Sequence, residues 1–120
     1  MATQDTGCTI HPYFQIHDGK VEAFKEICRR FIEKTKEESG CMYYGFSFDG
    51  NKAHCREGYK NADGLLAHLG NVGALIDEAL TISDITRLEV HGTSEELQKL
   101  YGPLSDFNPE YWQMEYGIRN

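Results

Sequence analysis

Two side chains in the middle of the chain, Glu57 and His68, are of the types that move protons in enzymes. The ordinary pKa of histidine lies near neutrality, so His68 can accept or donate a proton under physiological conditions. Glu57 shares the alternation of Cys55 and Tyr59, which predicts that its carboxyl group faces the apolar core, opposite Tyr44. A carboxylate in such a place is unfavourable unless it is paired, protonated or hydrated. Glu57 and His68 are therefore candidates for acid–base chemistry.

Both candidates also have a structural interpretation. On a helical wheel, His68 falls beside Leu65, Leu69 and Val72, at the edge of the apolar arc rather than at its centre. From there it either reaches into a pocket under the helix or merely hydrogen-bonds a strand. Glu57 can orient His68, hold a substrate hydroxyl or act as the base itself with a raised pKa, but it can equally form a salt bridge to a helix lysine or arginine.

Aromatic side chains on the same expected faces can form the wall of a substrate pocket: Tyr44, Tyr59, Phe46 and Phe14. A tyrosine can pack on an aromatic ring or donate a phenolic hydrogen bond, and ordinary core packing explains these residues as well. Asn71 follows His68 by about one helical turn and is a further candidate for contact with a substrate. Its place away from the apolar arc also fits a solvated or helix-ending residue.

The remaining histidines and the cysteines give weak signals for metal or thiol chemistry. Surface or interface positions explain the other histidines better than zinc ligation, because HxxxH and HxH spacings are missing among His11, His17, His54 and His91. A chain of this size needs no disulfide, so we expect free thiols, most of them packed as small apolar groups, at Cys8, Cys28, Cys41 and Cys55. Without a Walker loop or a strand-to-helix GxGxxG, we expect neither a metal nor a cofactor.

The composition is typical of one ordinary globular domain. The chain has 120 residues, 40% hydrophobic and 26% charged, with a net charge of −7. This acidity argues against nucleic acid as a partner, because such binding depends on clustered lysine and arginine. Apolar runs fall well short of the roughly 20 residues that span a bilayer, and residues 1–7 lack the layout of a signal peptide. We therefore expect a cytoplasmic protein with no membrane partner.

Alternating apolar residues predict four strands: Cys8–Ile16, Cys41–Asp49, Lys52–Tyr59 and residues 85–90. The turn Gly50-Asn51 joins the middle two into a hairpin, with Tyr44 opposite Glu57 and Phe46 opposite Cys55. Pro12 lacks an N–H group and therefore predicts an irregularity in the first strand.

A change of period to three and four predicts two amphipathic helices. The first runs from residue 20 to Ser39-Gly40, and Gly40 is suited to the left-handed cap position. The second begins after Asn61 and continues to residue 80, and Gly70 and Gly73 are expected to interrupt or bend it.

This β-α-β-β-α-β order predicts an α+β fold of the ferredoxin-like type, with both helices on one face of an antiparallel sheet. The opposite face carries Tyr13, Tyr43 and Arg87, and we expect no element of the same chain to cover it. Because a second sheet covers such a face more readily than bare water does, we expect a homodimer in the form of a dimeric α/β barrel. The core is expected over about residues 8–92.

A C-terminal extension is expected over about residues 93–120. Thr93 and Glu96 predict a capping box at the start of a short helix, and residues 111–118 predict a short strand or an ordered arm. Three aromatic residues, Tyr111, Trp112 and Tyr116, expose too much apolar area to stay free in water. We therefore expect the extension to dock and to bury Trp112.

The stretch from residue 10 to residue 92 resembles the antibiotic biosynthesis monooxygenase family, whose members are dimeric α/β barrels. Two segments carry the resemblance. In GKVEAFKEICRRFIEKTKEESGCMYYGFSFD an amphipathic helix runs into Glu38-Ser39-Gly40-Cys41. In CREGYKNADGLLAHL a strand with Glu57 and Tyr59 leads into a helix with His68. The order and spacing of the two segments make the resemblance more specific than either one alone.

The resemblance implies a homodimer and, in enzymatic members, oxidation of phenolic or quinol-like substrates by O₂ without metal, haem or flavin. It places the family's strand acid and aromatic on Glu57 and Tyr59 and its helix histidine on His68. Such a reaction needs a base for an electron-rich substrate and an apolar box around the intermediates. We therefore expect a cofactor-independent monooxygenase for a small aromatic or quinol-like substrate. A non-catalytic ligand-binding or stress-related protein with the same pocket is the alternative.

Overall fold

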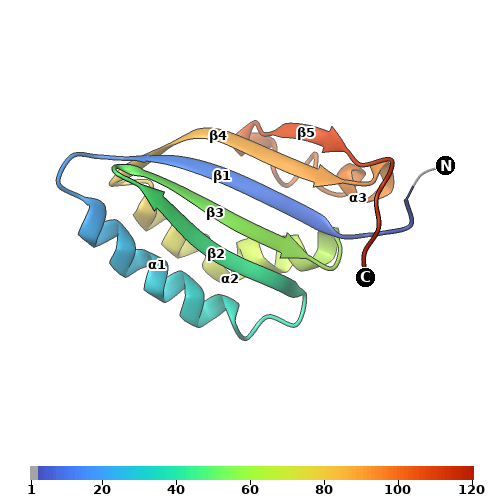
Figure 1. Ribbon diagram of the computed structural model, residues 1–120, viewed down its shortest axis with the longest axis horizontal. Helices are drawn as coiled ribbons and strands as arrows, with labels where there is room; N and C mark the ends of the chain where they lie inside the picture. Colours follow the sequence, from blue (N-terminus) through green and yellow to red (C-terminus); the bar gives the residue numbers. More distant parts are fainter. Residues whose placement is uncertain (1–2) are drawn as a thin grey trace.

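The computed structural model describes residues 3–120, so residues 1–2 of the polar stretch 1–7 lie outside the described part. Its elements, in chain order, are β1 Cys8–Ile16, α1 Val21–Thr35, β2 Cys41–Asp49, β3 Lys52–Tyr59, α2 Ala62–Ala79, β4 Ser83–Gly92, α3 Ser94–Gln98, the 3₁₀ turn η1 Ser105–Phe107 and β5 Glu110–Gln113. Figure 1 shows the two long helices side by side on one face of a twisted sheet.

The strand order in the sheet is β2-β3-β1-β4-β5. The first four strands pair antiparallel, and β5 adds to β4 in parallel. The predicted ferredoxin-like α+β fold with a C-terminal helix-plus-strand extension is therefore confirmed. Because α1 and α2 cover one face, that face and the helices enclose the core from which a site can be built (Figure 1).

The predicted register of the β2–β3 hairpin is also confirmed. Tyr44 lies opposite Glu57, and Phe46 lies opposite Cys55. The hairpin turns at Gly50, whose φ of 60° is a conformation that glycine adopts without strain. The irregularity expected near Pro12 is present one residue further on, where the β1–β4 register shifts between Tyr13 and Phe14.

The helices depart from the predictions in two places. Helix α1 ends at Thr35, and Gly40 is not among the residues with positive φ, so its predicted role as a left-handed cap is wrong. Helix α2 begins at the predicted cap, where the Asn61 side chain accepts a hydrogen bond from the Gly64 N–H at 2.9 Å. It then continues unbroken through Gly70 and Gly73, because packing of its buried face outweighs the low helix propensity of two glycines.

The C-terminal extension is ordered, but two of its predicted details are wrong. Thr93 stands at the N-cap of α3 without a side-chain hydrogen bond, and Glu96 accepts instead from the Ala62 N–H at 2.9 Å. Glu96 therefore ties the extension to the start of α2 rather than capping its own helix. Trp112 is 50% exposed in this chain and stacks on the ring of His91, because β5 directs it to the face of the sheet that the helices leave open.

Two apolar clusters fill the space between the sheet and the helices. One joins α1 and the first half of the hairpin to the end of α2, and the other joins the start of α2 and β4 to Leu97, Leu100 and Leu104 of the extension. Among residues 3–120, no helix combines the length and the hydropathy needed to cross a bilayer. Glu57 and His68 are buried polar side chains beside these apolar residues.

Candidate functional site

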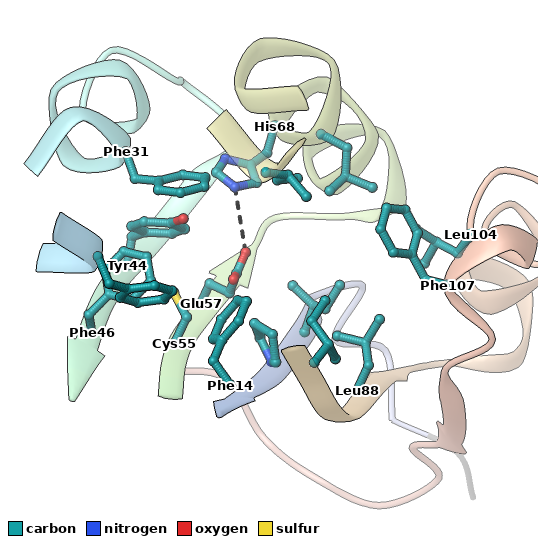
Figure 2. A pocket seen from close by; sticks show the side chains of 16 residues that line it. Phe14, Phe31, Tyr44, Phe46, Cys55, Glu57, His68, Leu88, Leu104 and Phe107 are labelled. Atoms are coloured by element: carbon teal, nitrogen blue, oxygen red, sulfur yellow. Dashed lines mark ion pairs between the residues drawn. The ribbon is translucent and has the colours of Figure 1, made fainter. Parts of the chain in front are cut away.

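A pocket lies between the sheet and the two long helices, with a volume of about 60 Å³. Its walls come from β1, β2, β3, β4, α1 and α2 and from residues 104 and 107 of the extension. Most of these side chains are apolar, and the groups that can exchange protons are Tyr44, Cys55, Glu57 and His68. Figure 2 shows the Glu57 carboxyl group rising from the sheet toward the His68 ring, with aromatic rings to one side of the pair.

Strand β3 places Glu57 because its alternation sends Cys55, Glu57 and Tyr59 to the helix side of the sheet. Glu57 is only 5% exposed, and Tyr59 is fully buried beside it. The Tyr59 hydroxyl donates a hydrogen bond of 2.5 Å to Glu57 Oε1. Among the described residues the ion-pair partner of Glu57 is His68 and not a lysine or arginine, so the predicted structural salt bridge to a basic helix residue is not present.

Helix α2 places His68 at the centre of its buried face rather than at the edge that the helical wheel suggested. The buried positions of α2 include Leu65, His68, Val72 and Leu75, which recur at intervals of three and four. His68 is 2% exposed because α1, packed alongside α2, covers the flank that would otherwise be open. Its Nε2 atom lies 3.6 Å from Glu57 Oε1, so the two predicted catalytic side chains do meet.

The sequence interpretation missed the second carboxylate of the site, Glu38. This residue follows α1, and its two carboxylate oxygens lie 2.9 and 3.1 Å from His68 Nδ1. The Asn71 amide donates to the same carboxylate at 2.8 Å and to the Lys34 carbonyl at 3.1 Å. Glu38 lies within Glu38-Ser39-Gly40-Cys41, the segment that carried the family resemblance, but no sequence spacing relates it to His68.

The loop that carries Glu38 is held against α2 by two glycines. A Cβ atom on Gly40 would lie 2.9 Å from the Gly64 Cα, and one on Gly64 would lie 3.0 Å from the Gly40 carbonyl oxygen. Such distances exclude any side chain at either position without movement of the backbone. The close approach brings the end of the α1–β2 loop beside the first turn of α2, and this allows Glu38 to reach His68.

The hydrogen bond to Glu38 defines the protonation pattern of His68. A carboxylate accepts, so Nδ1 carries the proton and the lone pair of the neutral ring lies on Nε2, which is directed at Glu57. Burial lowers the pKa of His68 below its usual value of 6.5, and the neighbouring Glu38 carboxylate partly offsets this effect. His68 is therefore a neutral base near pH 7 with its free nitrogen at the pocket.

Burial has the opposite effect on the carboxyl group of Glu57. Removal from water raises its pKa from 4.5 to about 7, with a further contribution from the Glu38 charge, while hydrogen bonds from Tyr59 and Cys55 oppose the rise. Near pH 7 the protonated and ionised forms of Glu57 therefore coexist. Burial also raises the pKa values of Tyr44 and Tyr59, so both stay neutral and act only as hydrogen-bonding or packing groups.

The predicted substrate-contact residues divide into two groups. Phe14, Tyr44 and Phe46 line the pocket and form an aromatic wall. Tyr59 and Asn71 do not line it: Tyr59 holds Glu57, and Asn71 holds Glu38. The structure therefore gives these two side chains a supporting position behind the acid–base pair rather than direct access to a ligand.

Apart from Cys55, the remaining histidines and cysteines do not line this pocket. His11, His54 and His91 are on the open face of the sheet, where His11 has ring-centroid distances of 6.1 Å to His54 and 5.0 Å to His91. Within residues 3–120 no group of three or more histidine, cysteine, aspartate or glutamate side chains is arranged to hold a metal ion. The four cysteines are unpaired, and burial raises their thiol pKa values, to about 12 for Cys28.

Comparison with known proteins relates this architecture to solved structures. No protein-family profile and no curated protein matches the chain. The crystal structure of MupZ from Pseudomonas fluorescens is 47% identical, with a TM-score of 0.94 over 100% of this chain and 94% of MupZ. A putative antibiotic biosynthesis monooxygenase from Nitrosomonas europaea is 20% identical, with a TM-score of 0.69 over 78% of this chain and 96% of that one. The chain belongs to the same family as MupZ, and it shares its fold with antibiotic biosynthesis monooxygenase-like proteins.

A third structure with this fold, that of an antibiotic biosynthesis monooxygenase, is 16% identical, with a TM-score of 0.61 over 69% of this chain and 92% of that one. At such identities the likeness shows the fold alone. A neutral imidazole and a carboxyl group with a pKa near 7 can exchange a proton with a bound molecule in either direction at neutral pH.

Proposed function

We propose that this member of the family is an acid–base enzyme and, more specifically, a cofactor-independent monooxygenase for an aromatic or quinol-like substrate. The observation that carries the proposal is the buried row Glu38–His68–Glu57, with distances of 2.9 Å and 3.6 Å, at the polar end of an otherwise apolar pocket. Burial of three titratable groups costs free energy even when they are paired, so their concentration at one cavity favours a catalytic role.

His68 is the proposed base. Its Nε2 lone pair takes a proton from the substrate, and the imidazolium ion that forms is stabilised by the Glu38 carboxylate on Nδ1. The histidine–carboxylate pair of a hydrolase triad works in the same way: the carboxylate fixes the tautomer of the imidazole and stabilises the positive charge that forms on it. Asn71 holds Glu38 in turn, which limits its rotation.

The substrate carbanion or phenolate that remains is electron-rich and can transfer an electron to O₂. Recombination forms a carbon–oxygen bond and a peroxide, which the protonated form of Glu57 can neutralise. For a CH₂ group beside an aromatic ring, loss of water then leaves a ketone, so one oxygen atom enters the product and the other leaves as water. The apolar walls, including Phe14 and Phe46, exclude bulk water from these intermediates.

The test is O₂ consumption by the purified protein with anthrone and a panel of phenols and quinols, in the presence of a chelator. We expect turnover in the wild type and a loss of about 10² to 10⁴ in rate for His68→Ala, as general-base removal typically produces. His54→Ala is the control, because His54 lies on the open face and contacts Tyr13 and His11 rather than the pocket.

Three outcomes separate the proposal from its rivals. Turnover without O₂ uptake that still depends on His68 would keep the acid–base role and reject the oxygenase. Tight binding across the panel without any conversion, with His68→Ala changing affinity alone, would favour a ligand-binding protein. Equal rates for the His68→Ala and His54→Ala variants would reject the site altogether.

A homodimer is the second part of the proposal. Tyr13 and Tyr43 lie on the open face, where Arg87 and Arg56 respectively cover their rings at 5.8 and 4.4 Å. The half-exposed Trp112 adds to the same face through its stack on His91. Within the described residues no helix covers this face (Figure 1), and a second sheet of the same kind would bury its aromatic groups.

A further inference from the structure

The pocket beneath His68 is too small to hold a whole aromatic ring. Its volume is about 60 Å³, whereas a protein cavity that binds benzene measures about 150 Å³. The polar atoms of Glu57 and His68 occupy part of its wall. The space therefore suits the oxygen-bearing edge of a substrate ring, and the rest of the molecule has to lie outside it.

A second hollow adjoins this pocket on its outer side. It is a surface groove of about 390 Å³ between α2 and the part of the extension that holds Pro103 and Phe107. Leu69, Ile76 and Phe107 line both the pocket and the groove. These three side chains therefore form the partition between the two spaces, and the groove leads toward the acid–base pair.

The floor of the groove is one face of α2. Leu66, Leu69, Gly70, Gly73 and Ile76 line it, and they recur at intervals of three and four residues. A Cβ atom on Gly70 or Gly73 would meet nothing within 4 Å, so the two glycines leave open space above the helix. This accounts for the presence of two residues that weaken a helix within an element that nevertheless stays unbroken.

Phe107 is the part of the partition that is least held by the core. It is 38% exposed and ends the short turn η1, just before Asn108 with a φ of 46°. Leu104, one turn earlier, is fully buried and anchors the segment. Figure 2 shows Phe107 and Leu104 together at the end of the pocket remote from Tyr44 and Phe46. Phe107 is therefore the side chain of the partition that can move most readily to join groove and pocket.

We infer that the groove binds the body of an elongated, neutral substrate whose oxygen-bearing end passes Phe107 to reach His68 and Glu57. The reacting end rests on the proposed function, whereas the body is assigned from the groove alone. Its lining is apolar apart from Asp77, and it contains no lysine or arginine, so a neutral hydrocarbon arm fits and an anionic one does not. The substrate class is thus a phenol, quinol or related molecule that carries an apolar chain or a second ring.

Binding of 4-alkylphenols, from 4-methylphenol to 4-octylphenol, tests the inference by calorimetry without any need for turnover. We expect affinity to rise about fourfold with each methylene that enters the groove, as burial of a CH₂ group implies. Gly73→Leu fills the floor and should weaken 4-octylphenol roughly tenfold while leaving 4-methylphenol unchanged. Gly70→Leu is a second variant of the same floor, so the test does not depend on the folding of one protein.

Ala74→Leu is the matched control, because Ala74 is exposed on the same helix and does not line the groove. Phe107→Ala should speed the association of 4-octylphenol in stopped-flow measurements. Phe48→Ala, at a phenylalanine of similar exposure away from the groove, should leave that rate unchanged.

The outcomes distinguish this inference from the oxygenase proposal. The groove assignment is overturned, even if O₂ is consumed, if the affinity for 4-alkylphenols does not depend on chain length. It is also overturned if this affinity falls equally in Gly73→Leu and Ala74→Leu. Length-dependent binding that Gly73→Leu and Gly70→Leu abolish supports the groove assignment even if none of the phenols is oxidised.

Discussion

The two faces of the sheet carry the same chemical pair in different surroundings. On the helix side, His68 lies between Glu38 and Glu57, and the side chains of all three are at most 11% exposed. On the open side, His17 lies 3.1 Å from Asp84, with side-chain exposures of 46% and 73%. Both faces therefore contain a histidine within ion-pair distance of a carboxylate, but only one of them excludes water in this chain.

The comparison shows that burial, and not the pairing itself, gives the site its chemistry. Water screens an exposed pair so strongly that it contributes little free energy. In the pocket the same groups lose hydration, and the first cause of the raised Glu57 pKa and of the lowered His68 pKa is this loss. A carboxyl group and an imidazole thereby both come to exchange protons near neutrality, at the cost of folding stability.

The largest expected effect is on the free energy of unfolding, which the burial of Glu57 lowers. The folded pKa of Glu57, about 7, lies above 4.5, so the unfolded chain loses its proton first and the free energy of unfolding falls as pH rises between these values. Glu57→Gln cannot ionise and should be more stable than the wild type at pH 8 by roughly 3 kcal/mol, while losing activity. Urea unfolding at pH 5 and pH 8 measures the difference.

Asp84→Asn provides the control from the open face. The exposed Asp84 should contribute less than about 1 kcal/mol at either pH. If Glu57→Gln and the wild type show the same pH dependence of unfolding, then Glu57 is not buried as a titrating group and the contrast between the faces is wrong.

A smaller effect is expected on rate when Glu38 loses its charge. Glu38→Gln keeps an oxygen for His68 Nδ1 but removes the carboxylate that raises the pKa values of His68 and Glu57. Both limbs of the pH–rate profile should therefore move to lower pH, and kcat/KM should fall about 10- to 100-fold, as loss of a charged hydrogen bond implies. Glu33→Gln, on the exposed side of α1, is the control. If the limbs of the pH–rate profile do not shift, the charge of Glu38 has no influence on the pair and Glu38 has only a packing role.

The smallest effect on the Glu57–His68 pair is expected from a substitution on the open face of the sheet. If two copies pair through this face, the wild type should sediment at twice the chain mass of 13.7 kDa, and Tyr13→Asp should shift it toward the monomer. The pH dependence of unfolding that Glu57 produces should persist in that variant, because Tyr13 points away from the pocket. A variant that stays dimeric would place the interface elsewhere.

Local patterns predicted most of this fold. The strand bounds of β1, β2 and β3 and the pairing of Tyr44 with Glu57 follow from alternation and a two-residue turn, both of which depend on neighbouring residues. Helix propensity predicts that Gly70 and Gly73 interrupt or bend helix α2, because propensity ignores the packing that holds the helix together. Thr93 and Glu96 matched a capping box, yet Glu96 found a partner at distant Ala62.

The site was predictable only as far as one element could be considered at a time. Glu57 and His68 were identified from their placement on a strand and on a helix. Glu38 and the central burial of His68 were missed, since both depend on how α1 and its following loop pack against α2. Trp112 was expected to be buried because of its area, but its direction depends on the face that β5 presents.

The backbone contact between Gly40 and Gly64 has a consequence for how such proteins diverge. It closes the β2–β3 hairpin at its base, so the hairpin is a loop whose two ends are held at contact distance. Insertions or deletions at its far turn, around Gly50, can lengthen or shorten the strands without changing the distance between Glu38 and His68. Relatives with hairpins of unequal length can therefore keep the same acid–base geometry, provided that both positions at the base stay glycine.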